Sequence, residues 1–188
     1  MKTINDLMPV KGALLTSFAG HTANQTPSAF YVLEDFLTKK NDIKRILEIG
    51  TAEGGTTILF GLHAFKNNGE TLTFDNQKVP EDSWKELAKL LGIELSNLNV
   101  FTEEGTNKIK EFVQRDGISL LFCDGGNKVQ EFNTFAPFLK SNDIIMAHDY
   151  KHEIVLSAIN PELLKQFDFY YQEDFDSLKT RILCMVKK

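Results

Sequence analysis

The stretch from Arg45 to Thr57 constrains the fold of this chain more than any other part of the sequence. An apolar run ends in an acid and a glycine, a glycine pair follows at Gly54 and Gly55, and an amphipathic helical pattern then begins. This order of features predicts a buried strand, a tight turn and a helix N-terminus. Open α/β sheets bind nucleotides at such a turn, so the stretch favours an α/β fold with a ligand site at this turn.

Strand-like apolar runs alternate with amphipathic helical segments along most of the chain. The expected strands cover residues 44–49, 70–75, 98–101, 118–124 and 143–147, and the expected helices cover 27–40, 56–66, 80–91, 107–114, 129–139 and 153–159. Strands that alternate with helices form parallel sheets through right-handed crossovers. Two final strand-like runs, 167–171 and 180–186, have no predicted helix between them and indicate an antiparallel hairpin.

The predicted architecture is therefore a three-layer, Rossmann-like α/β fold. We expect a seven-stranded, mostly parallel sheet with a C-terminal antiparallel hairpin strand and helices on both faces. The length of 188 residues fits one domain over residues 1–188. Within it we expect an N-terminal helical or lid segment over residues 1–40 and a Rossmann-like core over 44–186.

Composition narrows the classes of partner. The net charge is -5, and no block of lysine and arginine provides the phosphate-binding footprint of a nucleic-acid-binding protein. No apolar run approaches the ~18 residues of a membrane span, and the N-terminus lacks the apolar core of a signal peptide. Cys123 and Cys184 lie in apolar runs, as buried free cysteines do. We expect a cytoplasmic protein with a small-molecule substrate and no nucleic-acid or membrane partner. The oligomeric state stays open, with a homodimer as the working expectation.

The glycine spacing separates the possible nucleotides. Dinucleotide-binding folds use G-x-G-x-x-G to hold a pyrophosphate at a helix N-terminus, whereas this chain has Glu48 just ahead of Gly50 and the next glycines at 54 and 55. A carboxylate there repels pyrophosphate and suits a cationic ligand or a ribose. Asp75 and Asp124 also end predicted strands, and unpaired buried charge costs several kcal/mol. The three acids therefore predict a cationic ligand, a metal or water at one edge of the sheet, and an NAD-dependent oxidoreductase is disfavoured.

The turn at 48–56 resembles motif I of the class I S-adenosylmethionine-dependent methyltransferases. Residues 122–128 resemble the strand–acid–glycine segment of O-methyltransferase-like proteins, and residues 145–150 resemble their hydrophobic His-Asp strand ending. Together with Gln25-Thr-Pro27, the nearest branch looks like the small-molecule methyltransferases of the cephalosporin hydroxylase and rhamnosyl O-methyltransferase group, with the catechol O-methyltransferase-like group as a neighbour. The resemblance covers about residues 25–186 and implies S-adenosylmethionine-dependent methylation of a small molecule, with a hydroxyl as the expected acceptor group.

The resemblance also implies roles for residues of the donor site. Glu48 would lie near the amino group of the ligand or order the loop, Asp75 would accept both ribose hydroxyls, and Glu103, with Glu104, would contact adenine. Trp84 is either structural or flanks the adenine. The other implied cofactor-binding residues are Gly50, Thr51, Ala52, Gly54, Gly55, Thr56 and Asp124.

For catalysis the resemblance offers a metal or a base. Asp124 and Asp149 are the candidate ligands of a Mg²⁺ ion that would lower the pKa of a substrate hydroxyl. Lys128 stands one residue later than the catechol-type pattern places it, so the metal requirement stays open. Alternatively His148 or Lys128 acts as the general base. A His148–Asp149 pair requires the strand to have ended, because adjacent strand residues point to opposite faces. A further alternative is a non-catalytic protein of this fold that holds S-adenosylmethionine or S-adenosylhomocysteine. The methyl acceptor is not named by the sequence.

Overall fold

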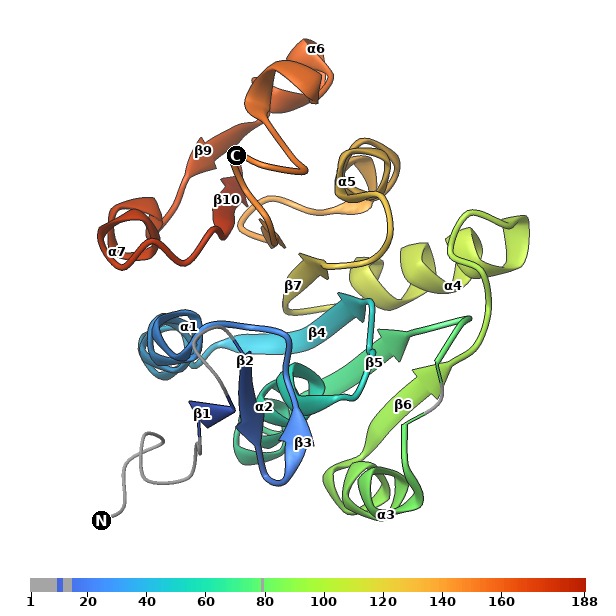
Figure 1. Ribbon diagram of the computed structural model, residues 1–188. Coiled ribbons are helices and arrows are strands. Elements are labelled where there is room, and N and C mark those ends of the chain that lie inside the picture. Colours follow the sequence, from blue (N-terminus) through green and yellow to red (C-terminus); the bar gives the residue numbers. More distant parts are fainter. Residues whose placement is uncertain (1–9, 12–14, 79) are drawn as a thin grey trace.

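The computed structural model describes residues 10–11, 15–78 and 80–188. Its centre is a seven-stranded sheet of order β6-β5-β4-β7-β8-β10-β9 (Figure 1). The five strands from β6 to β8 run parallel, and β10 pairs antiparallel with both β8 and β9. The strands are β4 (Ile43–Ile49), β5 (Glu70–Phe74), β6 (Ile93–Ser96), β7 (Ile118–Cys123), β8 (Ile144–Ala147), β9 (Phe167–Phe169) and β10 (Leu183–Lys187). The predicted mostly parallel sheet with an antiparallel C-terminal strand pair is confirmed.

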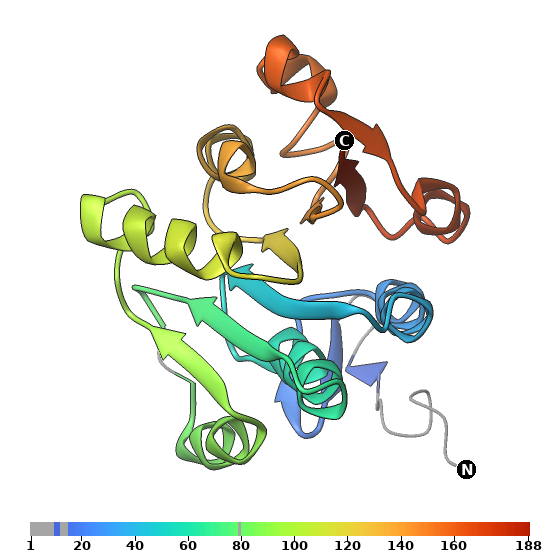
Figure 2. The ribbon, with the colours of Figure 1, turned by 180° about the vertical axis from the view of Figure 1, so that it is seen from behind.

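Helices cover both faces of this sheet, as the two opposite views show (Figures 1 and 2). One face carries α1 (Pro27–Lys39), α2 (Gly55–Lys66), α3 (Asp82–Leu91) and α7 (Gln172–Ser177). The other carries α4 (Glu103–Gln114), α5 (Lys128–Phe135) and α6 (Pro161–Leu164), with the short 3-10 helices η2 (Ala136–Phe138) and η3 (Leu156–Ala158). No helix in the described ranges is long and apolar enough to cross a membrane.

A small antiparallel sheet precedes α1. It consists of β1 (Val10–Lys11), β2 (Leu15–Phe18) and β3 (His21–Thr22). Thr26 then caps α1 by accepting a hydrogen bond from the Ala29 amide at 3.2 Å, which satisfies one of the free N–H groups of the first turn. The small sheet contacts α2 and leads the chain past the end of the large sheet, so residues 22–25 lie beside the turn that follows β4.

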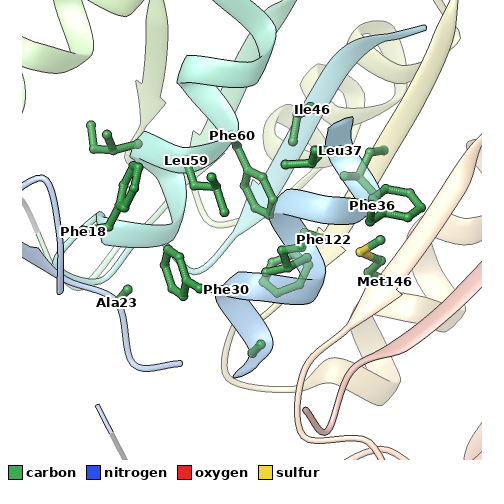
Figure 3. Close-up of a cluster of buried hydrophobic side chains, with 14 of the residues drawn as sticks. Phe18, Ala23, Phe30, Phe36, Leu37, Ile46, Leu59, Phe60, Phe122 and Met146 are labelled. Carbon is green, nitrogen blue, oxygen red and sulfur yellow. The ribbon is translucent and has the colours of Figure 1, made fainter. Parts of the chain in front are cut away.

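Two hydrophobic clusters form the core, one on each face of the sheet. Consecutive residues of β4 serve opposite clusters, since Ile46 packs into one and Leu47 into the other, and both are fully buried. The cluster under α1 and α2 is rich in aromatic side chains (Figure 3), among which Phe60 and Phe122 meet edge to face with centroids 5.3 Å apart. A central strand that is buried on both faces contains a continuous run of apolar residues, and this run allowed β4 to be predicted from the sequence.

The third strand lies earlier in the chain than predicted. The sequence predicted a strand over 98–101, whereas β6 covers Ile93–Ser96. Gly92 ends α3 with a left-handed φ of 68°, and the strand begins at the next residue in parallel register with β5. Leu98 and Val100 lie in the segment after β6, and they are apolar because they pack against the hydrophobic cluster under α4 and α5.

Two other predictions near the C-terminus were wrong. No α-helix covers 153–159, because the amides of His152 and Glu153 bond back to the Asp149 carbonyl in a turn and only η3 follows. The connection between β9 and β10 contains a helix, α7, although none was predicted. Its single buried apolar residue, Phe175, stands in a polar stretch, so the sequence shows no amphipathic period there.

Candidate functional site

The candidate site lies where the strand order of the sheet reverses. β4 pairs with β5 on one side and with β7 on the other, and ligands of open α/β sheets bind outside the carboxyl ends of strands at such a point. Gly50 follows β4, Asp124 follows β7 and His148 follows β8. Two cavities open here, an inner cavity of about 280 Å³ and an outer cavity of about 330 Å³, and Gly50 lines both.

Two glycines of the turn after β4 hold positions that no larger residue could occupy. Gly50 has a φ of 98°, and a Cβ there would lie 2.3 Å from the carbonyl oxygen of Asp124. Gly54 is the N-cap of α2 with a φ of 82°, and a Cβ there would lie 1.9 Å from Nε1 of Trp84. That indole nitrogen donates to the Gly54 carbonyl at 3.0 Å. Trp84 is therefore a buried support of the turn, and it does not line either cavity.

Glu48 lies beneath the turn and lines neither cavity. It is 1% exposed and accepts hydrogen bonds from the hydroxyl groups of Thr57 and Thr73, the latter at 2.8 Å. Burial raises the pKa of this carboxyl to about 8, against the opposing effect of the two hydroxyl donors. Of the two roles that the resemblance implied, this geometry fits the ordering of the loop.

The inner cavity brings together most of the residues that the sequence singled out. The turn after β4 and the start of α2 contribute Thr51, Ala52, Gly55 and Thr56. The ends of β7 and β8 and the start of α5 contribute a charged group, which we call the reactive cluster. It consists of Asp124, Lys128, His148 and Asp149. Residues 22–25, ahead of α1, close the remaining side.

His148 contacts two carboxylates through one ring nitrogen. Its Nδ1 lies 3.2 Å from Oδ1 of Asp124 and 3.3 Å from Oδ2 of Asp149. β8 ends at Ala147 and Asp149 has a left-handed φ of 58°, so the two neighbouring side chains can turn to the same side. Nδ1 bonded to carboxylates carries the proton, which leaves the lone pair of the neutral ring on Nε2.

The surroundings raise the pKa values of both Asp124 and His148 above those of the free side chains in water. Burial raises the pKa of Asp124, although the hydrogen bond from His148 opposes this effect. Burial alone would lower the pKa of His148, but the hydrogen bond to Asp124 and the charges of Asp124 and Asp149 outweigh it and raise that pKa. The pair therefore releases its proton less readily than the two side chains would in water.

Lys128 supplies the positive charge of the reactive cluster. Its ammonium donates to Glu153 at 2.7 Å and lies 3.6 Å from Oδ2 of Asp149 and 3.9 Å from Oδ1 of Asp124. Burial opposes the charge, but the hydrogen bond to Glu153 and the neighbouring carboxylates raise its pKa above the ordinary value. A lysine with a raised pKa stays an ammonium at neutral pH and has no lone pair for a proton.

Gln25 is a member of the site that the sequence did not identify as one. It is 1% exposed, lines the inner cavity, and its Nε2 donates to Oδ2 of Asp124 at 2.9 Å. Its Oε1 is buried and finds no hydrogen-bond partner among the described residues. The amide orientation follows from the carboxylate, which would repel the oxygen. Only the motif position of Gln25-Thr-Pro27 pointed to this residue, because a single glutamine carries no spacing signal.

The outer cavity has a more apolar wall. Phe74, Leu98, Val100 and Phe101 line it together with Asp75. Asp75 accepts from the Ala52 amide at 2.8 Å and from the amides of residues 77 and 78 at 2.9 and 2.8 Å, which fixes its carboxylate at the mouth of the turn. A carboxylate has about four lone-pair sites, so acceptor capacity remains for a ligand.

Glu103 and Glu104 lie outside both cavities. They are exposed and occupy the first turn of α4, whose N-cap is Thr102. Acids in a first turn interact favourably with the helix dipole, which accounts for Glu103 and Glu104 without a ligand.

Another acid of the outer cavity was not identified from the sequence. Glu131, 1% exposed, lines the outer cavity and accepts from the amides of Gly125 and Asn127, and burial raises its pKa to about 7. An acid in a first helical turn gives no distinct sequence signal.

Part of the reactive cluster has the arrangement of a metal site. Ligand atoms of Asp124, His148 and Asp149 all lie within 4.8 Å of one another. Two carboxylates suit a hard cation such as Mg²⁺, whereas an imidazole suits transition metals better. The ammonium of Lys128 already faces both carboxylates.

Comparisons with known proteins agree with this fold. No protein-family model matches the sequence, and no curated protein matches it significantly. Among solved structures, one of CmcI with Mg-SAM shares 14% identity at a TM-score of 0.66 over 92% of this chain and 76% of that chain. SAH-bound methyltransferase PaMTH1 of Podospora anserina shares 14% identity at a TM-score of 0.52 over 85% of this chain and 77% of that one. The chain thus has the fold of the class I S-adenosylmethionine-dependent methyltransferases.

Proposed function

We propose that this protein is an S-adenosylmethionine-dependent methyltransferase that methylates a hydroxyl group of a small molecule, with His148 as the general base. The observation that carries the proposal is the pair of cavities joined at Gly50, with His148 held between two carboxylates in the inner one. An S-adenosylmethionine-dependent methyltransferase needs a nucleoside pocket, a passage for the methionine part and a base at its end.

The residues present fit the methyl donor. The carboxylate of Asp75 suits a ribose diol, and the apolar wall of Phe74, Leu98 and Phe101 suits an adenine ring. Gly50 lets the backbone pass between the two cavities without a side chain. Thr51 and Gly55 would border the methionine part. S-adenosylmethionine supplies an electrophilic methyl group when it is bound.

His148 would take the proton of the acceptor hydroxyl at Nε2. Asp124 and Asp149 orient the ring through Nδ1 and stabilise the imidazolium that forms, in the way a carboxylate serves the histidine of a catalytic triad. Positioning supplies much of the remaining rate, because nucleophile and electrophile must be held at about 3–3.5 Å. Lys128, as an ammonium, would balance the two carboxylates and leave the base role to His148.

A divalent cation on Asp124 and Asp149 is the second candidate for activating the hydroxyl. The cluster of ligand atoms favours it, and the ammonium of Lys128 beside the same two carboxylates disfavours it. An assay of methyl transfer in EDTA distinguishes activation by His148 from activation by a metal. Full activity in EDTA supports His148 alone, whereas loss of activity that Mg²⁺ or Mn²⁺ restores supports the metal.

Donor binding is tested by calorimetry with S-adenosylhomocysteine and NAD. We expect the former to bind and NAD not to bind. Replacing Asp75→Ala removes hydrogen bonds to a charged acceptor, each worth about 1.5–3 kcal/mol, and should weaken S-adenosylhomocysteine binding ten- to a hundredfold. Asp42→Ala, an exposed acid paired with Lys40, is the control. Unchanged binding by the Asp75 variant would refute the ribose assignment.

Catalysis is separated from mere binding by a His148 variant. We expect His148→Ala to keep S-adenosylhomocysteine binding and to lose about 10²–10⁴-fold in methyl transfer to a hydroxyl acceptor, the usual contribution of a general base. Acceptors come from a panel of sugars, phenols and polyketides. A wild-type protein that binds the cofactor product but methylates no member of any acceptor class would favour the non-catalytic alternative.

The pKa of His148 gives a further test, and its NMR titration needs no acceptor. The hydrogen bond to Asp124 and the charges of Asp124 and Asp149 raise the pKa of His148 above 6.5. The base is therefore fully active only at a pH above this raised pKa. We expect Asp149→Asn to lower the pKa of His148 in an NMR titration and to move the acid limb of the rate profile to lower pH. Glu162→Gln, which breaks an exposed pair with Lys165, should leave both unchanged.

A further inference from the structure

A separate cavity adjoins the loop that carries Asp149. Its volume is about 360 Å³, and it is lined by Tyr150, Lys151, His152, Asp176, Lys179 and Arg181. Three of these six side chains are cations at neutral pH. Because the whole chain has a net charge of -5, this concentration of positive charge differs from the rest of the protein. We call it the basic cavity.

The charges of the basic cavity are not balanced from within. Asp176 is the single acid of its lining, and it accepts from the ammonium of Lys151 at 3.1 and 3.2 Å. Within the described ranges, the side chains of Lys179 and Arg181 form no hydrogen bond or ion pair. The lining of the cavity therefore keeps an excess of two positive charges.

The backbone places these cations at a conformational cost. Lys151, Lys179 and Arg181 all have left-handed backbones, with φ of 70°, 53° and 58°. Such a conformation costs a non-glycine residue roughly 1–2 kcal/mol, and strain of this kind concentrates at functional sites. The Tyr150 amide donates to the Arg181 carbonyl at 2.9 Å and joins the two loops. The strain thus falls on the three cations that face one cavity.

The basic cavity adjoins the reactive cluster through three consecutive residues. Asp149 contacts His148 and lines the inner cavity, whereas the next two residues, Tyr150 and Lys151, line the basic cavity. We propose that the basic cavity binds an oxyanion, a carboxylate, sulfate or phosphate group, with Arg181 and Lys179 as its main contacts. Arginine matches such groups with paired N–H donors. The anion is either a free ion or a group of the methyl acceptor. The second possibility rests on the proposed function.

The oxyanion site is tested with inorganic sulfate and phosphate at constant ionic strength set by chloride. Amide NMR signals of residues 150–152 and 179–181 should shift saturably in the wild-type protein. The double variant Lys179→Gln and Arg181→Gln should bind at least tenfold more weakly, whereas Lys165→Gln, on an exposed lysine paired with Glu162, should bind normally. Absence of saturable shifts, or equal binding by the double variant, overturns the proposal.

The source of the anion is assigned by methyl transfer to acceptor pairs that differ in one anionic group. For an acceptor-borne anion, Arg181→Gln should raise KM about tenfold for the anionic member, leave the neutral member unchanged, and leave S-adenosylhomocysteine binding unchanged. Equal KM effects on both members, with sulfate binding intact, assign the site to a free anion. If no acceptor is methylated while sulfate still binds, the proposed function fails and the oxyanion site stands.

Discussion

Glu48, on β4 beneath the turn, illustrates how one buried residue makes the stability of the fold depend on pH. Its carboxyl is surrounded by hydroxyl groups and apolar atoms, and burial raises its pKa from 4.5 to about 8. Between these two values the folded state holds a proton that the unfolded state has released. Stability therefore falls as the pH rises through this range, by on the order of 5 kcal/mol when each pKa unit is worth 1.36 kcal/mol.

Replacing Glu48→Gln should remove this loss. A glutamine oxygen still accepts from Thr57 and Thr73 and cannot ionise. In urea unfolding, we expect the variant to match the wild type near pH 5 and to exceed its stability by several kcal/mol near pH 8.5. Glu162→Gln, an exposed carboxyl, should follow the wild type at both values. A variant less stable than the wild type at pH 8.5 would show that Glu48 is ionised in the fold.

At the scale of the element, the N-terminus of α2 depends on the packing of α3. Gly54→Ala would place a methyl group against the indole of Trp84 and strain a φ of 82°. Gly92→Ala also meets a left-handed φ, of 68°, but nothing lies within 4 Å of its Cβ. We expect the second substitution to cost about 1 kcal/mol and the first to cost 1–3 kcal/mol more, as overpacking does. Thermal unfolding of both variants measures the difference, and equal costs would mean that Trp84 can move aside.

Elements with local signals could be predicted from the sequence, and those that depend on distant contacts could not. Thr26 before α1 and Gly92 after α3 mark helix ends through their own chemistry. In contrast, β6 is placed by its register with β5, and α7 is held by one phenylalanine against α1. The strand-end acids that frame the site were foreseen, because a parallel sheet aligns its carboxyl ends.

Two site features lay beyond the sequence for a physical reason. Gln25 meets Asp124 across 99 positions of sequence, a contact that no spacing rule contains. The His148–Asp149 arrangement required the strand to have ended, as was expected from the sequence, and β8 does end at Ala147; the left-handed backbone of Asp149 was not foreseen. Glu103, which the resemblance placed near adenine, lies in the first turn of α4 and lines neither cavity, and its contact with adenine stays a prediction.

At the scale of the molecule, the inner cavity joins parts of the chain that have little else in common. Residues 22–25 come from the end of β3 and the segment before α1, Gly50 from the turn after the central strand β4, and residues 148–149 from the segment leading to the C-terminal strand pair. A ligand that contacts all three binds the folded state alone, so it stabilises the whole fold by mass action. At a concentration of 100 times Kd the gain is about 2.7 kcal/mol.

S-adenosylhomocysteine should therefore protect distant segments together. We expect Tm to rise by about 5–11 °C at 100 times Kd, with slower hydrogen exchange in residues 22–25, 50–56 and 148–150 and unchanged exchange in α6, which lines neither cavity. NAD at the same concentration should change neither quantity. Gln25→Leu, which removes the link from the N-terminal segment to Asp124, should reduce protection in residues 22–25 more than in 50–56. Protection confined to the turn after β4 would show that the N-terminal segment takes no part in holding the ligand.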